Sequence, residues 1–169
     1  AATKKGRIVD NAQEGNQLAE TEHTITMMMA LARNSPQAAA SLKRGEWKRS
    51  KFMGNEMNGK VLGVVGFGRI GREVSKRAQA LQMTVIAYDP FIPAEVGAAM
   101  GVEMMSVADL FTKADVITVH TPLIPSTTHL INKESIATMK DGVRLINCAR
   151  GGIIDEAALY EAITSGKVA

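Results

Sequence analysis

Short apolar runs recur along the chain from Val61 to its end. The first, Val61–Val65, is continuously apolar and leads into Gly66, which is typical of a strand buried on both faces of a parallel sheet. Four later runs have the length and the apolar or β-branched content of strands. Strands are therefore predicted over Val61–Val65, Thr84–Tyr88, Val102–Met104, Asp115–Val119 and Val143–Asn147.

The segments between these runs carry apolar residues every three or four positions, which predicts amphipathic helices. The clearest of them places four apolar residues on one face: Ile70, Val74, Ala78 and Leu81. Ser106 followed by Asp109 resembles a capping box, and Asn132 and Asp155 are favourable N-cap residues. Helices are predicted over Arg69–Leu81, over Pro93–Met100, after Ser106, over Lys133–Met139 and from Asp155 to about Thr164.

This alternation of strands and helices builds a parallel sheet with helices on both faces. Because crossover connections are right-handed, a doubly wound sheet with strand order 3-2-1-4-5 is the natural topology. We therefore predict an α/β fold, a Rossmann-like doubly wound parallel sheet, with a long helix on its N-terminal side.

The first sixty residues follow a different pattern. Gln17–Arg33 is predicted to be a long helix and Gln37–Arg44 a second one, whereas Gly45–Asn58 is polar and irregular. The residues expected along one side of the long helix are Ile25, Met28, Met29 and Ala32. The irregular segment holds Trp47, Phe52 and Met53.

The composition is that of a globular domain. Of the 169 residues, 46% are hydrophobic and 22% are charged, which supplies one hydrophobic core. No apolar stretch reaches about 18 residues, so no membrane span is expected, and the first residues lack the apolar core of a signal peptide. The single cysteine, Cys148, has no partner for an internal disulfide, so a cytoplasmic location is expected.

Charge and residue usage also argue against two classes of site. The formal net charge is +3, the basic residues are mostly dispersed and aromatic residues make up 4%. A nucleic-acid interface would need a concentrated basic face, often with stacking aromatics, so none is expected. The histidines and the cysteine show no metal-ligand spacing, so no metal site is expected.

The first candidate site is the pattern G-x-G-x-x-G at residues 66–71, between the first predicted strand and the first predicted helix. In that context Gly66 permits a tight turn, Gly68 lets the backbone approach a pyrophosphate, and Gly71 lets helix and strand pack closely. The helix N-terminus adds unpaired N–H groups and a positive dipole end. We therefore predict a dinucleotide site, and a glycine-rich turn without a ligand is the alternative.

The second candidate is Asp89, which lies 18 residues after Gly71 at the end of the second predicted strand. A carboxylate there accepts hydrogen bonds from both hydroxyls of the adenosine ribose and repels a 2′-phosphate, so the predicted cofactor is NAD rather than NADP. The alternative is a simple turn, because Asp89 followed by Pro90 is also turn chemistry.

The third candidate is His120-Thr121-Pro122, which closes the fourth predicted strand. Ligands bind at the carboxyl ends of strands in such folds. Thr121 is expected to bond ribose or phosphate, and His120 and Pro122 are expected to form a wall of the site. No catalytic role is expected for any of the three histidines, His23, His120 and His129.

The fourth candidate is the segment 147–152, Asn-Cys-Ala-Arg-Gly-Gly, after the fifth predicted strand. The guanidinium of Arg150 matches a carboxylate in two parallel hydrogen bonds and polarises an adjacent keto oxygen, which makes it the one candidate for substrate chemistry. Cys148 has no sequence neighbour that would make it a nucleophile, and it is expected to form, with Ala149, a small wall beside the nicotinamide. A surface arginine at a turn is the alternative.

Together these segments resemble the D-isomer-specific 2-hydroxyacid dehydrogenases over essentially the whole chain. Within that family, Trp47–Asn58 and Cys148 are most similar to the members that oxidise 3-phosphoglycerate in serine synthesis. The matching stretches are Glu22-His23-Thr24, Leu31-Ala32-Arg33, Trp47-Lys48-Arg49, Phe52-Met53-Gly54, Gly66–Arg72, Tyr88-Asp89-Pro90, His120-Thr121-Pro122-Leu123, Pro125-Ser126-Thr127-Thr128 and Asn147–Gly152.

The resemblance implies a role for several residues. Arg69 and Ile70 would lie against the pyrophosphate, and Asp89 would hold the adenosine ribose. Arg150 matches the family's catalytic arginine, which binds the 2-hydroxyacid substrate. Thr121, Cys148 and Arg150 would line the cofactor and substrate side. The resemblance also implies a homodimer or larger homo-oligomer, formed through Gln17–Arg33 and the segment around Trp47.

The resemblance further implies that the chain is a fragment. Residues 1–16 would be the end of the substrate domain and the crossover from it, and residues 17–169 an NAD-binding domain that is incomplete at its C-terminus. The family's glutamate and its general acid/base histidine would lie beyond Ala169. Two positions depart from the family. The family often has proline at the position of Gln13. It often has glycine at the position of Gln82, where a left-handed helix cap is expected.

Three functional hypotheses follow from these expectations. The first is an NAD-dependent oxidation of 3-phosphoglycerate by the longer parent enzyme. The second is the same chemistry on glycerate, glyoxylate or hydroxypyruvate, or D-lactate. The third is a non-catalytic NAD-sensing module that dimerises.

Overall fold

The computed structural model describes residues 5–6 and 15–169, so residues 1–4 and 7–14 of the predicted segment 1–16, including Gln13, lie outside the described residues. Five parallel strands form one sheet in the order β3-β2-β1-β4-β5, which confirms the predicted fold class and strand order. The strands are β1 (Val61–Val65), β2 (Thr84–Tyr88), β3 (Glu103–Met104), β4 (Val116–Val119) and β5 (Arg144–Asn147).

Helices surround this sheet and extend from it. The helical elements are α1 (Gln17–Arg33), α2 (Ser35–Lys43), the 3₁₀ helix η2 (Arg49–Phe52), α3 (Arg69–Ala80), α4 (Ala94–Ala98), α5 (Val107–Lys113), α6 (Lys133–Thr138) and α7 (Glu156–Ser165). Two expectations need correction. The second helix begins at Ser35 rather than Gln37, because Pro36 sits in its first turn, where a missing N–H costs nothing. The segment expected to be irregular contains η2.

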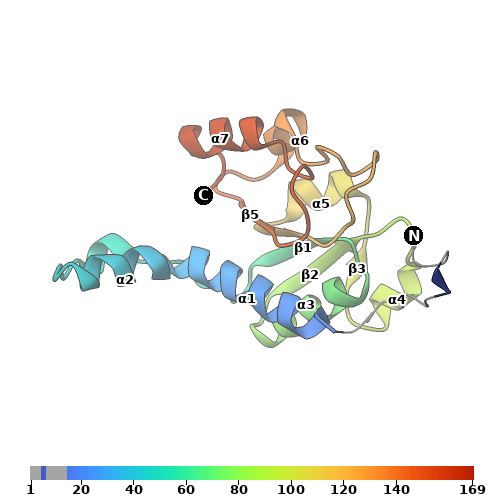
Figure 1. Cartoon of the computed structure of the whole chain (residues 1–169), viewed down its shortest axis with the longest axis horizontal. Coiled ribbons are helices and arrows are strands. Elements are labelled where there is room, and N and C mark those ends of the chain that lie inside the picture. Colours follow the sequence, from blue (N-terminus) through green and yellow to red (C-terminus); the bar gives the residue numbers. More distant parts are fainter. Residues whose placement is uncertain (1–4, 7–14) are drawn as a thin grey trace.

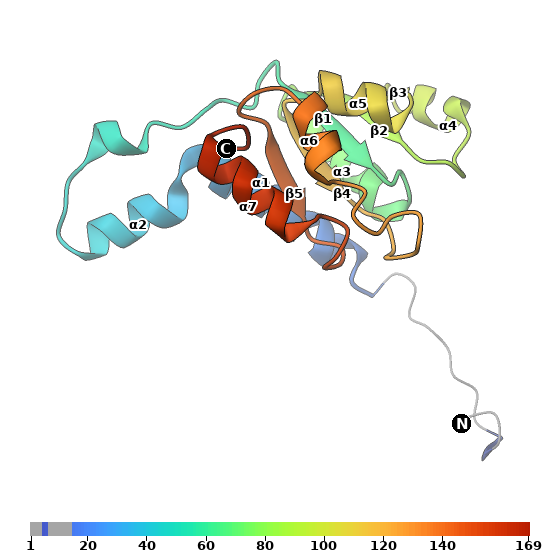
Figure 2. The same cartoon turned by 90° about the horizontal axis from the view of Figure 1, so that it is seen from above.

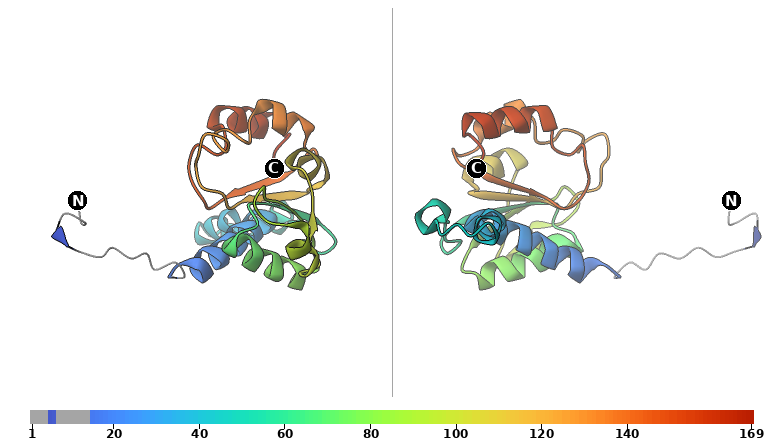
Figure 3. Two further views of the ribbon diagram at one scale, coloured as in Figure 1. Left: turned by 90° about the vertical axis from the view of Figure 1, so that its right-hand side faces the viewer. Right: turned by 60° about the vertical axis from the view of Figure 1, so that its left-hand side comes forward.

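The helices lie in two layers, one on each face of the sheet (Figures 1 and 3). On one face α1 packs against α3, and on the other face α5, α6 and α7 pack together. Strand alternation assigns each apolar side chain to one layer, because successive residues point to opposite faces. Val64 therefore belongs to the core under α1 and α3, and Val65 to the core under α5–α7.

The long helix α1 is amphipathic, as predicted, and Met28 and Ala32 are fully buried on its inner face. The sequence did not indicate that Thr21 and Thr24 are buried with them. Each threonine hydroxyl donates to the carbonyl of the residue four positions earlier, at 2.8 and 2.9 Å, so no unpaired polar group enters the packing.

Beyond α1 the chain leaves the body of the molecule. Residues 35–53, which we call the arm, contain α2 and η2 and extend away from the sheet (Figures 1 and 2). The chain then returns to the end of α1, where the N–H of Asn55 donates to the carbonyl of Ala32 at 2.8 Å. Gly54 passes so close to this carbonyl that a Cβ atom there would collide with it.

The helix caps follow the sequence with one difference. Asn132 forms a full capping box with Ser135, and the Asp155 carboxylate accepts the N–H groups of the first turn of α7. The Ser106 hydroxyl accepts the N–H of Asp109 at 3.1 Å, but the Asp109 carboxylate accepts from the Ser106 hydroxyl, at 2.6 Å, instead of completing a capping box. Gln82 adopts φ of 61°, so the left-handed position expected there is confirmed with a non-glycine residue.

Candidate active site at the carboxyl ends of the strands

Four strands end in one row across the sheet. Val65 of β1 is in register with Tyr88 of β2 and with Val119 of β4, and Val119 is in register with Asn147 of β5. Three candidate motifs begin one residue after this row, at Gly66, Asp89 and His120, and the fourth begins in the row itself, at Asn147. The fold thus brings all four sequence-predicted segments to a single edge of the sheet.

The first and third glycines of the G-x-G-x-x-G segment are required by the packing of the protein itself. Gly66 has φ of 97°, and a Cβ atom there would lie 2.7 Å from the carbonyl oxygen of His120. A Cβ atom on Gly71 would collide with the carbonyl oxygen of Gly66 and crowd Val64. These contacts support the roles predicted for a tight turn and for close helix–strand packing.

Gly68 is different, because its missing side chain leaves space. No atom of the described part of the chain lies within 4 Å of a Cβ built there. Gly68 is also the N-cap of α3, and as a glycine it has no side chain with which to cap that helix. The N-terminus of a 12-residue helix thus lies beside an open position, which fits the pyrophosphate of a dinucleotide. Arg69, exposed, and Ile70, half-buried, begin the helix at this point.

Asp89 lies beside the glycine turn. Its Oδ2 accepts the N–H of Phe67 at 2.8 Å, and its Oδ1 accepts the N–H of Phe91 at 2.9 Å. The bond to Phe91 is the turn chemistry that was the alternative interpretation, whereas the bond to Phe67 connects the carboxylate with the cofactor turn. Asp89 as the ribose acceptor stays a prediction, and its position next to Phe67 supports it.

His120 and Thr121 bring two unpaired polar atoms to the same edge. His120 Nδ1 and Thr121 Oγ1 are buried and have no hydrogen-bond partner among the described residues. Nε2 of His120 lies 3.0 Å from the hydroxyl of Thr118, which is buried. Because buried polar atoms are almost always paired, the two atoms indicate a polar ligand group at this position. Pro122 follows them and is exposed.

Burial also sets the charge of His120. It lowers the pKa of the imidazole from 6.5 to about 4, because the charged form loses its hydration. His120 is therefore a neutral and weakly basic group at pH 7, which agrees with its expected role as a wall of the site.

The segment after β5 is organised by Asn147. The side-chain amide of Asn147 donates to the carbonyl of Arg150 at 2.8 Å, and its oxygen accepts the N–H of Ala149 at 3.0 Å. Arg150 is exposed, and its Nη1 donates to the carbonyl of Ala149 at 2.7 Å. The guanidinium thus stands at the surface of the strand-end edge.

Cys148 is half-buried and faces a cavity of about 300 Å³ between β5 and the first two helices. Met27, Ala30 and Leu31 of α1 line the same cavity. This placement makes Cys148 part of the packing of β5 against α1, and its predicted place beside the nicotinamide stays a prediction.

Three parts of this site were not identified from the sequence: the hydroxyl of Thr118, the side chain of Asn147 and the backbone N–H of Phe67. Thr118 carries a usable signal, since it is a polar residue within an apolar strand and shares a strand face with His120 two positions later. The Phe67 contact joins residues 22 positions apart and has no local signal.

Within residues 5–6 and 15–169, no helix is long and apolar enough to cross a membrane. No group of three or more metal-ligating side chains is present in the same part of the chain.

Comparison with known proteins agrees with this geometry. The family described as "D-isomer specific 2-hydroxyacid dehydrogenase, NAD binding domain" matches residues 25–169. D-3-phosphoglycerate dehydrogenases from Methanocaldococcus jannaschii and Homo sapiens are each 54% identical to this chain over 169 residues, covering 99% and 100% of it. The chain spans 32% of the length of either relative.

A solved structure shows the same likeness in three dimensions. D-lactate dehydrogenase from Aquifex aeolicus, complexed with NAD and lactic acid, has a TM-score of 0.87 and 35% identity, over 99% of this chain and 50% of that one. The resemblance inferred from the motifs is therefore confirmed. The chain belongs to the D-isomer specific 2-hydroxyacid dehydrogenase family as its NAD-binding domain, with NAD as the cofactor.

Proposed function

We propose that the protein carrying this chain is an NAD-dependent dehydrogenase that oxidises D-3-phosphoglycerate to 3-phosphohydroxypyruvate. The observation that carries the proposal is the open position at Gly68, at the N-terminus of α3 and at the same edge of the sheet as Asp89 and His120. The substrate class is supported by the relatives at 54% identity, which are D-3-phosphoglycerate dehydrogenases.

In this proposal the chain's own residues hold and orient the cofactor. The N–H groups at the start of α3 bind the pyrophosphate, and Gly68 gives them access. Asp89 accepts the ribose hydroxyls through the acceptor sites that its two backbone bonds leave open. His120 Nδ1 and Thr121 Oγ1 gain the partners that they lack. When bound, NAD supplies the hydride acceptor.

Arg150 is proposed to bind the carboxylate of the substrate and to polarise the oxygen at C2. Asn147 fixes the backbone on both sides of it through the bonds to Ala149 and Arg150. His120 is a poor acceptor for the proton of the hydroxyl group, because burial lowers its pKa to about 4 and its Nε2 lies against the hydroxyl of Thr118. The family resemblance assigns that step to a different histidine.

The test measures turnover by the full-length protein with NAD and three substrates: D-3-phosphoglycerate, D-glycerate and D-lactate. Highest kcat/KM on D-3-phosphoglycerate is expected, and a preference for an unphosphorylated substrate would contradict the proposed specificity. Arg150→Gln is expected to lower kcat/KM by at least about 100-fold, because a charged bidentate contact is lost. Lys113→Gln, a charge-matched change at an exposed residue of α5, is the control and should leave kcat/KM unchanged.

A non-catalytic NAD-sensing module is the second candidate, favoured by a site that can hold the nucleotide without any proton-transfer group among the described residues. The same assay separates the two candidates. Tight NAD binding, without turnover of any 2-hydroxyacid or of the matching 2-oxoacid, would favour the NAD-sensing module over the dehydrogenase.

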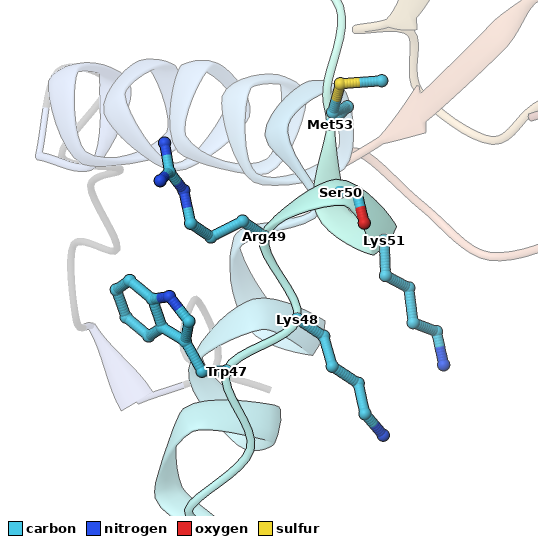
Figure 4. Close-up of a pocket in the computed structure, with 6 residues that line it drawn as sticks. All are labelled: Trp47, Lys48, Arg49, Ser50, Lys51 and Met53. Atoms are coloured by element: carbon cyan, nitrogen blue, oxygen red, sulfur yellow. The ribbon is translucent and has the colours of Figure 1, made fainter.

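The protein is also proposed to form a homodimer through α1 and the arm. The arm exposes large apolar side chains, with Trp47 76% and Met53 78% exposed. Figure 4 shows Trp47 and Arg49 pointing to one side of the arm and Lys48 and Lys51 to the other. An exposed tryptophan on a projecting segment is typical of a surface that is covered in an assembly.

Trp47 itself reports on this dimer, because it is the only tryptophan of the chain. Its fluorescence emission should move to shorter wavelength as protein concentration rises and a partner covers the ring. Sedimentation of Trp47→Ala should show a weaker dimer than the unchanged chain, with Tyr160→Ala on the exposed face of α7 as the control. A monomer at every concentration would overturn the dimer.

The proposed cellular location is the cytoplasm, based on the single cysteine and the proposed metabolic activity. Fractionation of cells that produce the full-length protein tests this location. Recovery in a secreted or membrane fraction would contradict it.

A further inference from the structure

The carboxylate of Asp89 makes one hydrogen bond to each of two loops before any ligand is present. Oδ2 accepts the N–H of Phe67 in the turn between β1 and α3, at 2.8 Å. Oδ1 accepts the N–H of Phe91 in the turn after β2, at 2.9 Å. Because the two bonds use different oxygens and different loops, they restrict the side chain to one orientation.

The Phe67 end of this contact is itself held firmly. The Phe67 side chain is 0% exposed and belongs to the core under α1 and α3. The neighbouring N–H of Gly66 donates to the carbonyl of Tyr88 at 2.8 Å, so the turn is joined to the end of β2 by one backbone bond and by the Asp89 carboxylate. Of these two bonds, only the second depends on a side chain.

The turn held in this way is the one that sets the direction of Gly68. Phe67 lies between Gly66, which has a left-handed backbone, and Gly68, which caps α3 with extended backbone. If the Phe67 N–H lost its acceptor it would be a poorly solvated donor above a buried ring, and the turn would relax toward other conformations. The open position at Gly68 depends on the turn remaining in its present shape.

We propose that Asp89 is a positioning residue that holds the Gly66–Gly68 turn in its cofactor-ready shape, independently of any contact with ribose. The inference rests on the proposed function, because the shape of the turn affects activity only if NAD binds there. It follows that replacing Asp89 to admit NADP loosens the pyrophosphate site as well as removing the repulsive charge.

The first test needs no ligand. Amide hydrogen exchange of Phe67 is compared in the full-length protein, without cofactor, between the unchanged sequence, Asp89→Ala and Asp89→Asn. Exchange of the Phe67 amide should accelerate by about tenfold to a hundredfold in Asp89→Ala, because a charge-assisted bond is lost. In Asp89→Asn one amide oxygen faces two donors, so either Phe67 or Phe91 should accelerate.

Glu95→Gln is the matched control, since it removes the same charge from an exposed residue of α4 six positions later. Its Phe67 amide should exchange at the unchanged rate. Unaltered exchange of Phe67 in Asp89→Ala would overturn the inference, and so would equal acceleration in Glu95→Gln. This result does not depend on NAD, so it stands apart from any failure of the proposed function.

The second test separates positioning from ribose recognition. Titration with NAD is compared with titration by an NAD analogue whose adenosine ribose lacks both hydroxyls. A residue that acts only through the ribose would not affect binding of the analogue. We expect Asp89→Ala to weaken binding of the analogue by about tenfold as well, and equal binding of the analogue to both proteins would overturn the inference.

Discussion

The strand-end edge and the arm are built in opposite ways. At the strand-end edge, residues from four strands meet in one row, and the chain contacts itself so closely that neither Gly66 nor Gly71 can accept a side chain. In the arm, the side-chain bonds of Glu46 are local: it binds Ser41, Arg44 and Lys48, all within five residues of it. Two large apolar side chains of the arm, Trp47 and Met53, are exposed.

The two regions differ in the contacts that hold them in place. The strand-end edge is held by contacts between residues of distant strands, and it has two buried polar atoms, on His120 and Thr121, without a partner among the described residues. In the arm, the neighbouring cations hold the pKa of Glu46 below its usual value, although that carboxylate is not buried. One chain therefore contains both the edge where we propose that the cofactor binds and the segment where we propose that a second copy docks.

The largest effect is expected from Gly71→Val, which should break the strand-end edge as a structure. The new side chain would collide with the Gly66 carbonyl, which is backbone and cannot move away without displacing the turn. The free energy of unfolding should fall by more than about 3 kcal/mol, as measured by urea denaturation. A change below about 1 kcal/mol would show that the edge is less closely packed than the structure indicates.

Protonation of His120 should have the next largest effect, and only on the strand-end edge. Its pKa is about 4 in the folded chain and 6.5 ordinarily, so between these values the unfolded chain binds the extra proton. The stability is therefore fully present above pH 6.5 and is lost as pH falls toward 4.

Between pH 7 and pH 5 this loss should amount to about 2 kcal/mol. His120→Gln should flatten the pH dependence of urea denaturation in that window. His129→Gln, a change at an exposed histidine, is the matched control. The same slope in His120→Gln as in the unchanged chain would contradict the assignment.

Gly68→Val should weaken NAD binding without destabilising the fold, because the position beside Gly68 is open. A Cβ atom there would meet no atom of the described residues beyond its chain neighbours, and the backbone is extended, so the free energy of unfolding should change by less than about 1 kcal/mol. NAD affinity, measured by calorimetric titration, should fall by at least about 100-fold because the methyl groups occupy the pyrophosphate position. Unchanged affinity would place the cofactor elsewhere.

Trp47→Ala should have the smallest effect on the fold. The side chain is mostly in water in a single chain, so the free energy of unfolding of the dilute monomer should change by less than about 0.5 kcal/mol. Denaturation at low protein concentration measures this change. A larger loss would mean that the arm contributes to the folding of its own chain, and the contrast between the two regions would weaken.

Several elements could be predicted because their signals are local. The five strands and the helix Gln17–Arg33 follow from hydrophobic periodicity, and the caps at Asn132 and Asp155 from single side chains. The extension of the arm away from the sheet had no such signal, since residues 45–58 lack a periodic pattern. The burial of Thr21 and Thr24 was missed because helical back-bonding makes a threonine compatible with an apolar face.

The sequence by itself determined the order of elements, the strand order and the motifs that follow each strand. Periodicity and strand-end motifs depend on residues that are close in sequence, and the right-handed crossover is a general rule for parallel strands. Only the tertiary structure showed which atoms impose the predicted roles of the three glycines. Gly66 and Gly71 are needed for packing and Gly68 for open space, because the atoms that distinguish them include the carbonyl of His120, more than fifty residues away. Asp89 reaches Phe67 for the same reason: parallel strands place distant residues side by side.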